Sequence, residues 1–98
     1  MFGKFGDMMG KLHEMKQKAD EIKKKLENTV INSETAGIKI EINGNRKVNS
    51  VVIPESLAGD KAELEKNLRD AVNKAIADAD RVNEDEMKKV AGSMLPGL

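Results

Sequence analysis

Ninety-eight residues suffice for one small domain with a modest core, and we expect residues 1–98 to form a single domain. Lys and Arg together equal Asp and Glu at 17 each. This zero net charge argues against a simple polyanion binder, which carries a basic excess. The absence of cysteine excludes disulfides and thiolate metal sites within the sequence. No stretch is apolar enough for a signal peptide or a membrane span, so we expect a soluble cytoplasmic protein that does not bind membranes.

Residues 1–6 are short and glycine-containing, and we expect them to form a flexible arm. From Asp7, a typical N-cap residue, apolar residues recur at the spacing of a coiled-coil seam, which predicts a helix over residues 7–27. Lysines flank this seam at the positions where paired helices face each other, so a parallel pair of identical helices would be repelled. The helix is therefore expected to face an acidic surface, either the second long helix or a polyanion. The seam consists of Met8, Leu12, Met15, Ala19, Ile22 and Leu26.

The clearest strand pattern begins at Ile38, where three isoleucines alternate with polar residues. The Asn-Gly-Asn sequence at 43–45 tolerates the positive φ that tight hairpin loops require. The chain then returns as a second strand that ends before Pro54, which cannot donate to a ladder. Residues 28–33 predict a further strand beside this hairpin, so residues 28–53 are expected to form a three-stranded antiparallel sheet.

The return strand carries apolar residues on both of its faces, although only one face can pack on the core. Its alternation places Val48 and Val52 on the face opposite Val51 and Ile53. Three covers remain open for Val48 and Val52: a loop, a neighbouring strand after a bulge, or a second copy of the chain. The last is considered because exposed apolar patches often mark interfaces.

Residues 60–91 predict a second long helix. Asp60 is a typical cap, Glu63 completes a capping box, and no Gly or Pro interrupts the helical period that follows. Small residues in the first half of this helix permit close approach to a sheet or to another helix. Gly92 ends the predicted helix, and residues 92–98 are expected to form an irregular apolar tail.

These elements predict an α+β domain, ordered as a long N-terminal helix, a small three-stranded antiparallel sheet and a long C-terminal helix. Both helices are longer than the sheet can cover, which leaves apolar surface exposed and predicts a homodimer. The expected interface residues are Met8, Leu12, Val48, Val52, Met94 and Leu95.

The sequence holds no constellation of catalytic residues. His13 is the only histidine and lies outside the apolar seam, without an orienting acid or a nucleophile pattern. The acidic residues within 78–86 lack the glycine and the ligand spacing of a calcium loop, and residues 59–61 lack the rest of a phosphate-loop motif. We therefore expect no enzymatic activity, no metal or cofactor, and no small-molecule substrate.

Lysines crowd the first helix and recur near the end of the second. They have two interpretations: a solvated face that pairs with nearby acids, which is the commoner outcome for such a composition, or a surface that contacts phosphates. The lack of aromatic residues between them argues against base stacking on single strands, so any nucleic acid bound here is expected to be duplex. The candidate DNA-binding residues are Lys11, Lys16, Lys18, Lys23, Lys24, Lys25, Lys88 and Lys89.

Five segments, in this order, resemble the bacterial YbaB/EbfC family of nucleoid-associated proteins. They are MFGKFGDMM at the N-terminus, GIKIEING in the hairpin, residues 51–53 with Ser56 and Leu57, residues 64–68 with 70–75, and GSMLPG near the C-terminus. The resemblance implies a small cytoplasmic α/β homodimer whose paired helices project from a sheet-based body. It also implies binding to duplex DNA and a role in nucleoid organisation or gene regulation.

The resemblance supplies no residue-level binding motif, so the candidate lysines rest on charge position alone. The first helix is richer in lysine than the Gln- and Met-rich versions of the family, which favours phosphate contact. The alternative function is a dimeric interaction scaffold that does not bind DNA, in which these lysines pair with the acidic second helix.

Overall fold

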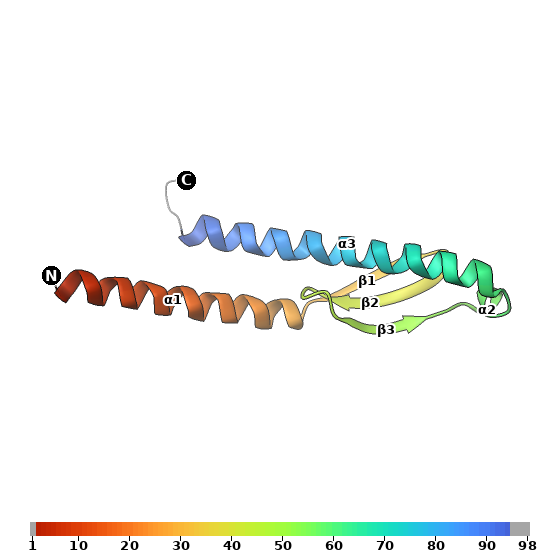
Figure 1. Cartoon of the computed structure of the whole chain (residues 1–98), viewed down its shortest axis with the longest axis horizontal. Coiled ribbons are helices and arrows are strands. Elements are labelled where there is room, and N and C mark those ends of the chain that lie inside the picture. Colours follow the sequence, from red (N-terminus) through yellow and green to blue (C-terminus); the bar gives the residue numbers. More distant parts are fainter. Residues whose placement is uncertain (1, 95–98) are drawn as a thin grey trace.

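The computed structural model describes residues 2–94, with side chains from 6 to 92. The molecule is a rod with extents of 71 × 23 × 17 Å. Its order of elements confirms the predicted α+β fold (Figure 1). The elements are α1 (Phe2–Glu27), β1 (Val30–Thr35), β2 (Ile38–Asn43), β3 (Val48–Val52), α2 (Glu55–Ala58) and α3 (Lys61–Met94).

The three strands form an antiparallel sheet in the order β1-β2-β3, and α3 packs across β1 and β2. The core joins three isoleucines of β2 to three alanines of α3. The alanines recur every four residues and therefore form one stripe, whose small side chains let α3 lie close to the sheet. The buried residues of this core are Ile38, Ile40, Ile42, Ala71, Ala75 and Ala79.

The tight hairpin loop that requires positive φ joins β1 to β2. Ala36 has a φ of 53° and Gly37 a φ of 85°, which is the pattern of a two-residue primed turn. In the second hairpin the positive φ belongs to Arg46, at 66°, and to no residue of 43–45. The prediction that the Asn-Gly-Asn sequence supplies positive φ was therefore wrong, and Gly44 has another role that is described below.

A bulge in β3 changes which valines share a face. Val51 pairs with Ile40, and Val48 pairs with Ile42 after a register shift, so both valines lie on the side of the sheet that faces α3. Val52 pairs with Lys39 and lies on the opposite side. The prediction that Val48 and Val52 share a face was wrong, because strict alternation does not allow for the extra residue of a bulge.

Both long helices extend beyond their predicted limits. Helix α1 begins at Phe2, so residues 2–6 belong to the helix and the prediction that it starts at Asp7 was wrong. Helix α3 continues through Gly92 to Met94, beyond the predicted end at residue 91. Extending an existing helix by a few residues costs far less than nucleating one, so isolated glycines do not stop it. Residues 95–98 of the predicted tail lie outside the described residues.

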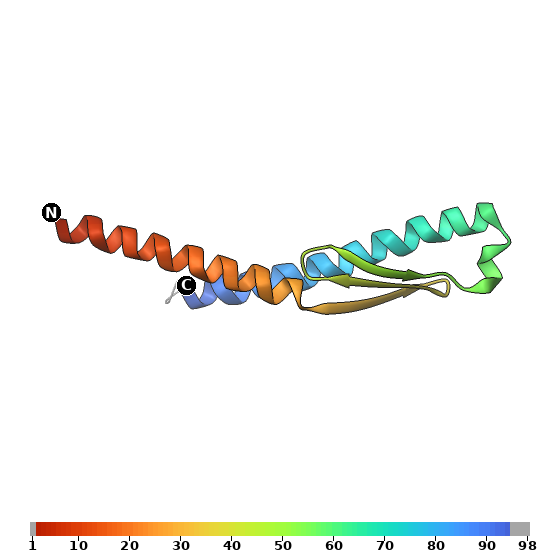
Figure 2. The same cartoon turned by 90° about the horizontal axis from the view of Figure 1, so that it is seen from below.

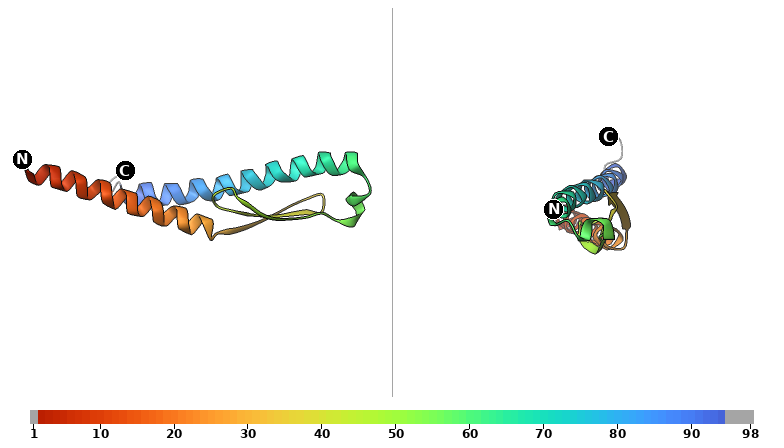
Figure 3. Two further views of the ribbon diagram at one scale, coloured as in Figure 1. Left: turned by 60° about the horizontal axis from the view of Figure 1, so that its bottom comes forward. Right: turned by 90° about the vertical axis from the view of Figure 1, so that its right-hand side faces the viewer.

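The sheet lies at one end of the rod, and two helical segments extend from it in the same direction with opposite chain polarity (Figures 1 and 2). We call α1 and residues 82–94 of α3 the arms, and residues 30–81 the body. Figure 3 shows from a third direction that α1 reaches beyond the C-terminal end of α3. Within residues 2–94, no helix is both long and apolar enough to cross a membrane.

The body covers only the last part of the α1 seam. Ile22 and Leu26 are buried, whereas Met8 is 63% exposed, Leu12 59% and Met15 52%. The valines of β3 are exposed as well, since α3 lies over β1 and β2. One chain by itself therefore leaves two apolar surfaces uncovered, one along α1 and one along β3. The side chain of Met94 and all of Leu95 lie outside the description.

Candidate nucleic-acid interface

The candidate lysines all lie on the two arms. Six are on α1, and Lys88 and Lys89 are on the arm of α3. Among the side chains of residues 6–92, five lysines of α1 form no ion pair with any acid. Their ammonium groups are therefore available to an external anion. These five are Lys11, Lys16, Lys18, Lys23 and Lys24.

Lys25 is the α1 lysine that pairs with the second helix. Its Nζ donates to the Glu86 carboxylate at 3.1 Å, and Lys89 Nζ lies 3.6 Å from the other oxygen of the same carboxylate. The hydrogen bond from Lys25, together with the charges of both lysines, holds the pKa of Glu86 below its ordinary value. Glu86 thus remains ionised and links the two arms where they leave the body.

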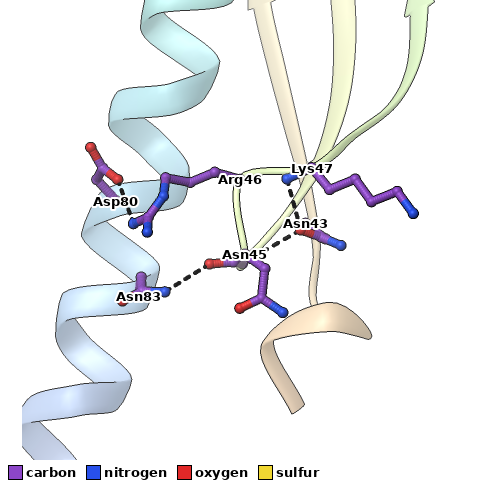
Figure 4. Close-up of polar contacts among 7 residues, drawn as sticks. Asn43, Asn45, Arg46, Lys47, Asp80 and Asn83 are labelled. Atoms are coloured by element: carbon purple, nitrogen blue, oxygen red, sulfur yellow. Dashed lines mark hydrogen bonds and ion pairs between the residues drawn. The ribbon is translucent and has the colours of Figure 1, made fainter. Parts of the chain in front are cut away.

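The loop between β2 and β3, residues 43–47, lies at the same level as this ion pair. Asn43 is buried, and its Oδ1 accepts hydrogen bonds from the backbone N–H of Asn45 at 2.9 Å and of Lys47 at 3.0 Å (Figure 4). The Asn43 side chain thus provides an acceptor for two backbone N–H groups in the loop, where no strand-to-strand hydrogen bonds form. We call this segment the 43–47 turn.

The 43–47 turn caps the C-terminal end of α1. The backbone N–H of Gly44 donates to the Leu26 carbonyl at 2.8 Å, and the Asn45 side-chain amide donates to the Lys23 carbonyl at 2.9 Å. The last four carbonyls of a helix have no i+4 partner within the helix, and the Gly44 N–H bonds to one of these, that of Leu26. The Asn45 amide adds a second bond at the Lys23 carbonyl, just before them. The end of α1 is thereby fixed to the hairpin.

The same turn is attached to α3. The Asn83 side-chain amide donates to the Gly44 carbonyl at 3.1 Å, and the Arg46 guanidinium pairs with Asp80 at 2.9 Å (Figure 4). A glycine is needed at position 44 because of space. An added Cβ would lie 2.7 Å from the Leu26 Cδ2 and 2.9 Å from the Leu26 carbonyl oxygen. The turn therefore holds both arms through direct contact.

Sequence reasoning missed the residues of this junction. Arg46 and Lys47 add two basic groups beside the lysine-rich end of α1, yet they were not among the candidate residues. The Asn-Gly sequence did indicate a turn, but its partners Leu26, Asp80 and Asn83 are distant along the chain. No local pattern connects them, so only the structure identifies this contact.

The open face of the sheet forms a shallow hollow of about 380 Å³. Acidic, basic, amide and hydroxyl side chains alternate across it without a cluster of one charge. The residues that the structure describes contain no group of His, Cys, Asp and Glu that could hold a metal ion. This face therefore offers less to a polyanion than the arms do. It is lined by Asn32, Ser33, Glu34, Lys39, Ile40, Glu41, Ser50 and Val52.

Comparison with known proteins agrees with this picture of the fold. A nucleoid-associated protein of Chlorobium phaeovibrioides is 34% identical over 92 residues, which cover 92% of this chain and 84% of the relative. One from Flavobacterium johnsoniae is 42% identical over 75 residues, covering 74% of this chain and 71% of the relative. The crystal structure of an uncharacterised Helicobacter pylori protein aligns with a TM-score of 0.73 and 25% identity, over 89% of this chain and 91% of that one.

Residues 1–94 also match one protein family as a whole, and this family is named for DNA binding and not for an enzymatic activity. The match begins in the lysine-rich arm, includes the sheet and the 43–47 turn, and ends with α3. The chain belongs to the YbaB/EbfC DNA-binding family.

Proposed function

We propose that the protein binds duplex DNA as a homodimer, mainly by contacts between lysines of the arms and phosphates. In this proposal it acts in the bacterial nucleoid, in the cytoplasm, where it organises DNA or regulates genes. The observation that carries the proposal is the set of five α1 lysines without an ion pair among the described side chains. Membership of a DNA-binding family and relatives called nucleoid-associated proteins support it.

Phosphate contact suits this arrangement for a physical reason. Lys11 and Lys18 flank the α1 seam on one side and Lys16 and Lys23 on the other, and each lysine that neutralises a phosphate releases condensed counterions. The chain has zero net charge, so the attraction depends on local separation of charge, with the basic excess on α1. The lysines recognise the backbone and not the bases, so we expect little dependence on sequence.

The dimer proposal rests on the uncovered apolar surfaces. Met8 and Leu12 on α1 and the valines of β3 are exposed in one chain, although hydrophobic seams of this spacing normally pack against another helix. We propose that a second copy covers them, with Val48, Val52, Met94 and Leu95 also at the contact. Two copies present two lysine-rich arms, which doubles the number of phosphate contacts available to one duplex.

Fluorescence anisotropy with a labelled duplex of random sequence tests the proposal. A duplex of about 30 base pairs is roughly 100 Å long, which exceeds the 71 Å length of the protein. We expect saturable binding that weakens steeply as salt is raised, with a slope of about 0.9 in log–log form for each phosphate contact. Absence of binding at low salt would contradict the proposal.

Charge-neutralising variants locate the contact. Replacing Lys11, Lys16, Lys23 and Lys24 with Gln should weaken binding and flatten the salt slope by about 0.9 for each contact removed. The matched control removes four positive charges at the far end of the body, with Gln at Lys39, Lys61, Lys66 and Arg69. If both variants weaken binding equally, net charge and not the arm determines affinity.

A dimeric interaction scaffold that does not bind DNA remains the second candidate. It is favoured by the Lys25–Glu86 pair, in which an α1 lysine is neutralised by the second helix. Under this alternative the arms serve as a protein-binding surface, and the anisotropy experiment shows no saturable signal. The two candidates are thus separated by one titration of the unaltered protein.

A further inference from the structure

We infer that the 43–47 turn is the joint that sets the relative position of the two arms, and that it affects DNA affinity through this position. Its residues are positioning residues for the lysines of α1. This inference rests on the proposed function, because arm position matters for affinity only if the arms grip a duplex. The part that concerns arm geometry can be tested independently of DNA.

The first support is that few other contacts connect the arms. Helix α1 contacts α3 only sparsely, and most of its seam is exposed. Within the described residues, the Lys25–Glu86 pair is the ion pair that joins them directly, and Lys25 is 62% exposed. Glu86 is 15% exposed, but a single ion pair to an exposed lysine does not by itself fix the angle between two long helices. The orientation of α1 must therefore be set where the helix meets the body.

The second support is the number of bonds that meet at this turn. Two hydrogen bonds connect it to the last turn of α1, and one hydrogen bond and one ion pair connect it to α3. The Asn43 side chain, which is 3% exposed, fixes the turn internally. The turn thus contacts both helices at once while its own shape is held from within.

The third support is the lack of space at Gly44. The nearest backbone atom to an added Cβ is the Leu26 carbonyl oxygen, at 2.9 Å. A backbone atom cannot rotate away as a side chain does, so alanine at position 44 must push the end of α1 away from the turn. Helix α1 has 26 residues and is therefore about 39 Å long at 1.5 Å per residue. A small tilt at its C-terminal end therefore displaces the lysines farther along the helix by more than it displaces Leu26.

The arm geometry is measured with spin labels. The chain has no cysteine, so His13→Cys on α1 and Asp85→Cys on α3 introduce two labelling sites that lie outside the proposed phosphate contacts. Labelled chain is diluted into an excess of unlabelled chain, so that distances within one chain dominate. We expect Gly44→Ala to shift or broaden the distance distribution between the arms relative to the unaltered turn.

The same variants, without labels, are tested for DNA binding. We expect Gly44→Ala to weaken binding on the order of tenfold and to lower the salt slope by about 0.9 for each phosphate contact that no longer fits. Should Gly44→Ala fail to fold, Asn45→Ala and Asn83→Ala remove one bond on each side of the joint without adding any atom. Asn73→Ala, an exposed residue of the same helix α3, is the control and should change neither quantity.

The outcomes separate this inference from the proposed function. If the label-to-label distances are unchanged in Gly44→Ala, the turn does not set the position of the arms. If Gly44→Ala does not fold, unchanged distances in both Asn45→Ala and Asn83→Ala lead to the same conclusion. Changed distances with unchanged affinity and salt slope would overturn the link between arm position and binding. If the unaltered protein binds no duplex, the proposed function fails, while the distances still decide whether the turn sets the arms. Changed distances together with weaker binding would support the whole inference.

Discussion

Glu86 lies between Lys25 of α1 and Lys89 of its own helix, so its carboxylate competes with a phosphate for the same two ammonium groups. The carboxylate side chain is 15% exposed, whereas the two lysines are largely exposed. Lys25 and Lys89 were both predicted to bind DNA. In the free protein their charge is instead directed toward an internal acid, which makes them less available than the other lysines of the arm.

We therefore expect Glu86→Gln to strengthen duplex binding, because the substitution releases two ammonium groups while keeping the side-chain shape. The salt slope should steepen by up to about 1.8, at 0.9 for each added phosphate contact. Salt titration by anisotropy measures this change. Glu84→Gln on the same arm removes one negative charge without an ion pair in the described part of the chain. An equal gain in that control would assign the effect to net charge.

The difference between the unaltered protein and Glu86→Gln should depend on pH. The pKa of Glu86 is lowered in the folded protein, so its charge persists below the ordinary glutamate pKa, and the stability it contributes is complete above that ordinary value. Both are lost as the pH falls through the lowered value. The ratio of the duplex affinities of Glu86→Gln and the unaltered protein should therefore approach one only at acid pH. Repeating the anisotropy titration at several pH values measures this ratio.

At the scale of elements, α1 is a helix whose apolar side has a partner only at its C-terminal end. Ile22 and Leu26 are buried, while Met8, Leu12 and Met15 are exposed. Helices in proteins owe most of their stability to packing of an apolar face. The N-terminal part of α1 therefore lacks this stabilisation within one chain.

Leu12→Gln should weaken the dimer, because it places an amide in the centre of the exposed part of the seam. Since Leu12 is 59% exposed in one chain, the substitution should change the stability of the body little. Sedimentation velocity over a range of protein concentrations measures the shift toward monomer. Ala62→Gln, on the exposed part of α3 at the far end of the body, serves as the control. An unchanged dimer in Leu12→Gln would exclude the α1 seam from the interface.

Sequence periodicity predicted the elements well because each depends on neighbours along the chain. The alternation of Ile38 to Ile42 and the long helical period of α3 are local signals. The bulge at Asn49 was not predictable, since one extra residue leaves no mark in the composition. The joint was not predictable either, because Gly44 faces Leu26, which comes from a different element. The eight candidate lysines lie on α1 and on the arm of α3, yet the sequence did not indicate that Lys25 and Lys89 share Glu86.

At the scale of the whole molecule, the rod has a compact end and an exposed end. The buried side chains gather mainly in the body, around β2 and the first half of α3, while the arms carry the candidate lysines. A long molecule with little core gains stability from anything that binds its arms. Its thermal behaviour should therefore reflect association as well as folding.

We expect the midpoint of thermal unfolding to rise with protein concentration and to rise further when duplex DNA is added, as linkage requires for a folded dimer that binds DNA. Circular dichroism at helical wavelengths over a wide range of concentrations measures the first effect. Leu12→Gln is the reference, because its midpoint should depend less on concentration. A midpoint that stays constant in the unaltered protein would argue for a stable monomer.

The consecutive order β1-β2-β3 has a consequence for how fast the protein reaches its structure. Neighbouring strands are also neighbours in sequence, and the loops between them are short. Chains dominated by such near-neighbour contacts fold rapidly, because little loop-closure entropy is lost before contacts form. The body can therefore assemble ahead of the arms. If a second copy covers the seam of α1, as proposed, that seam is ordered in a slower, second-order step whose rate depends on protein concentration.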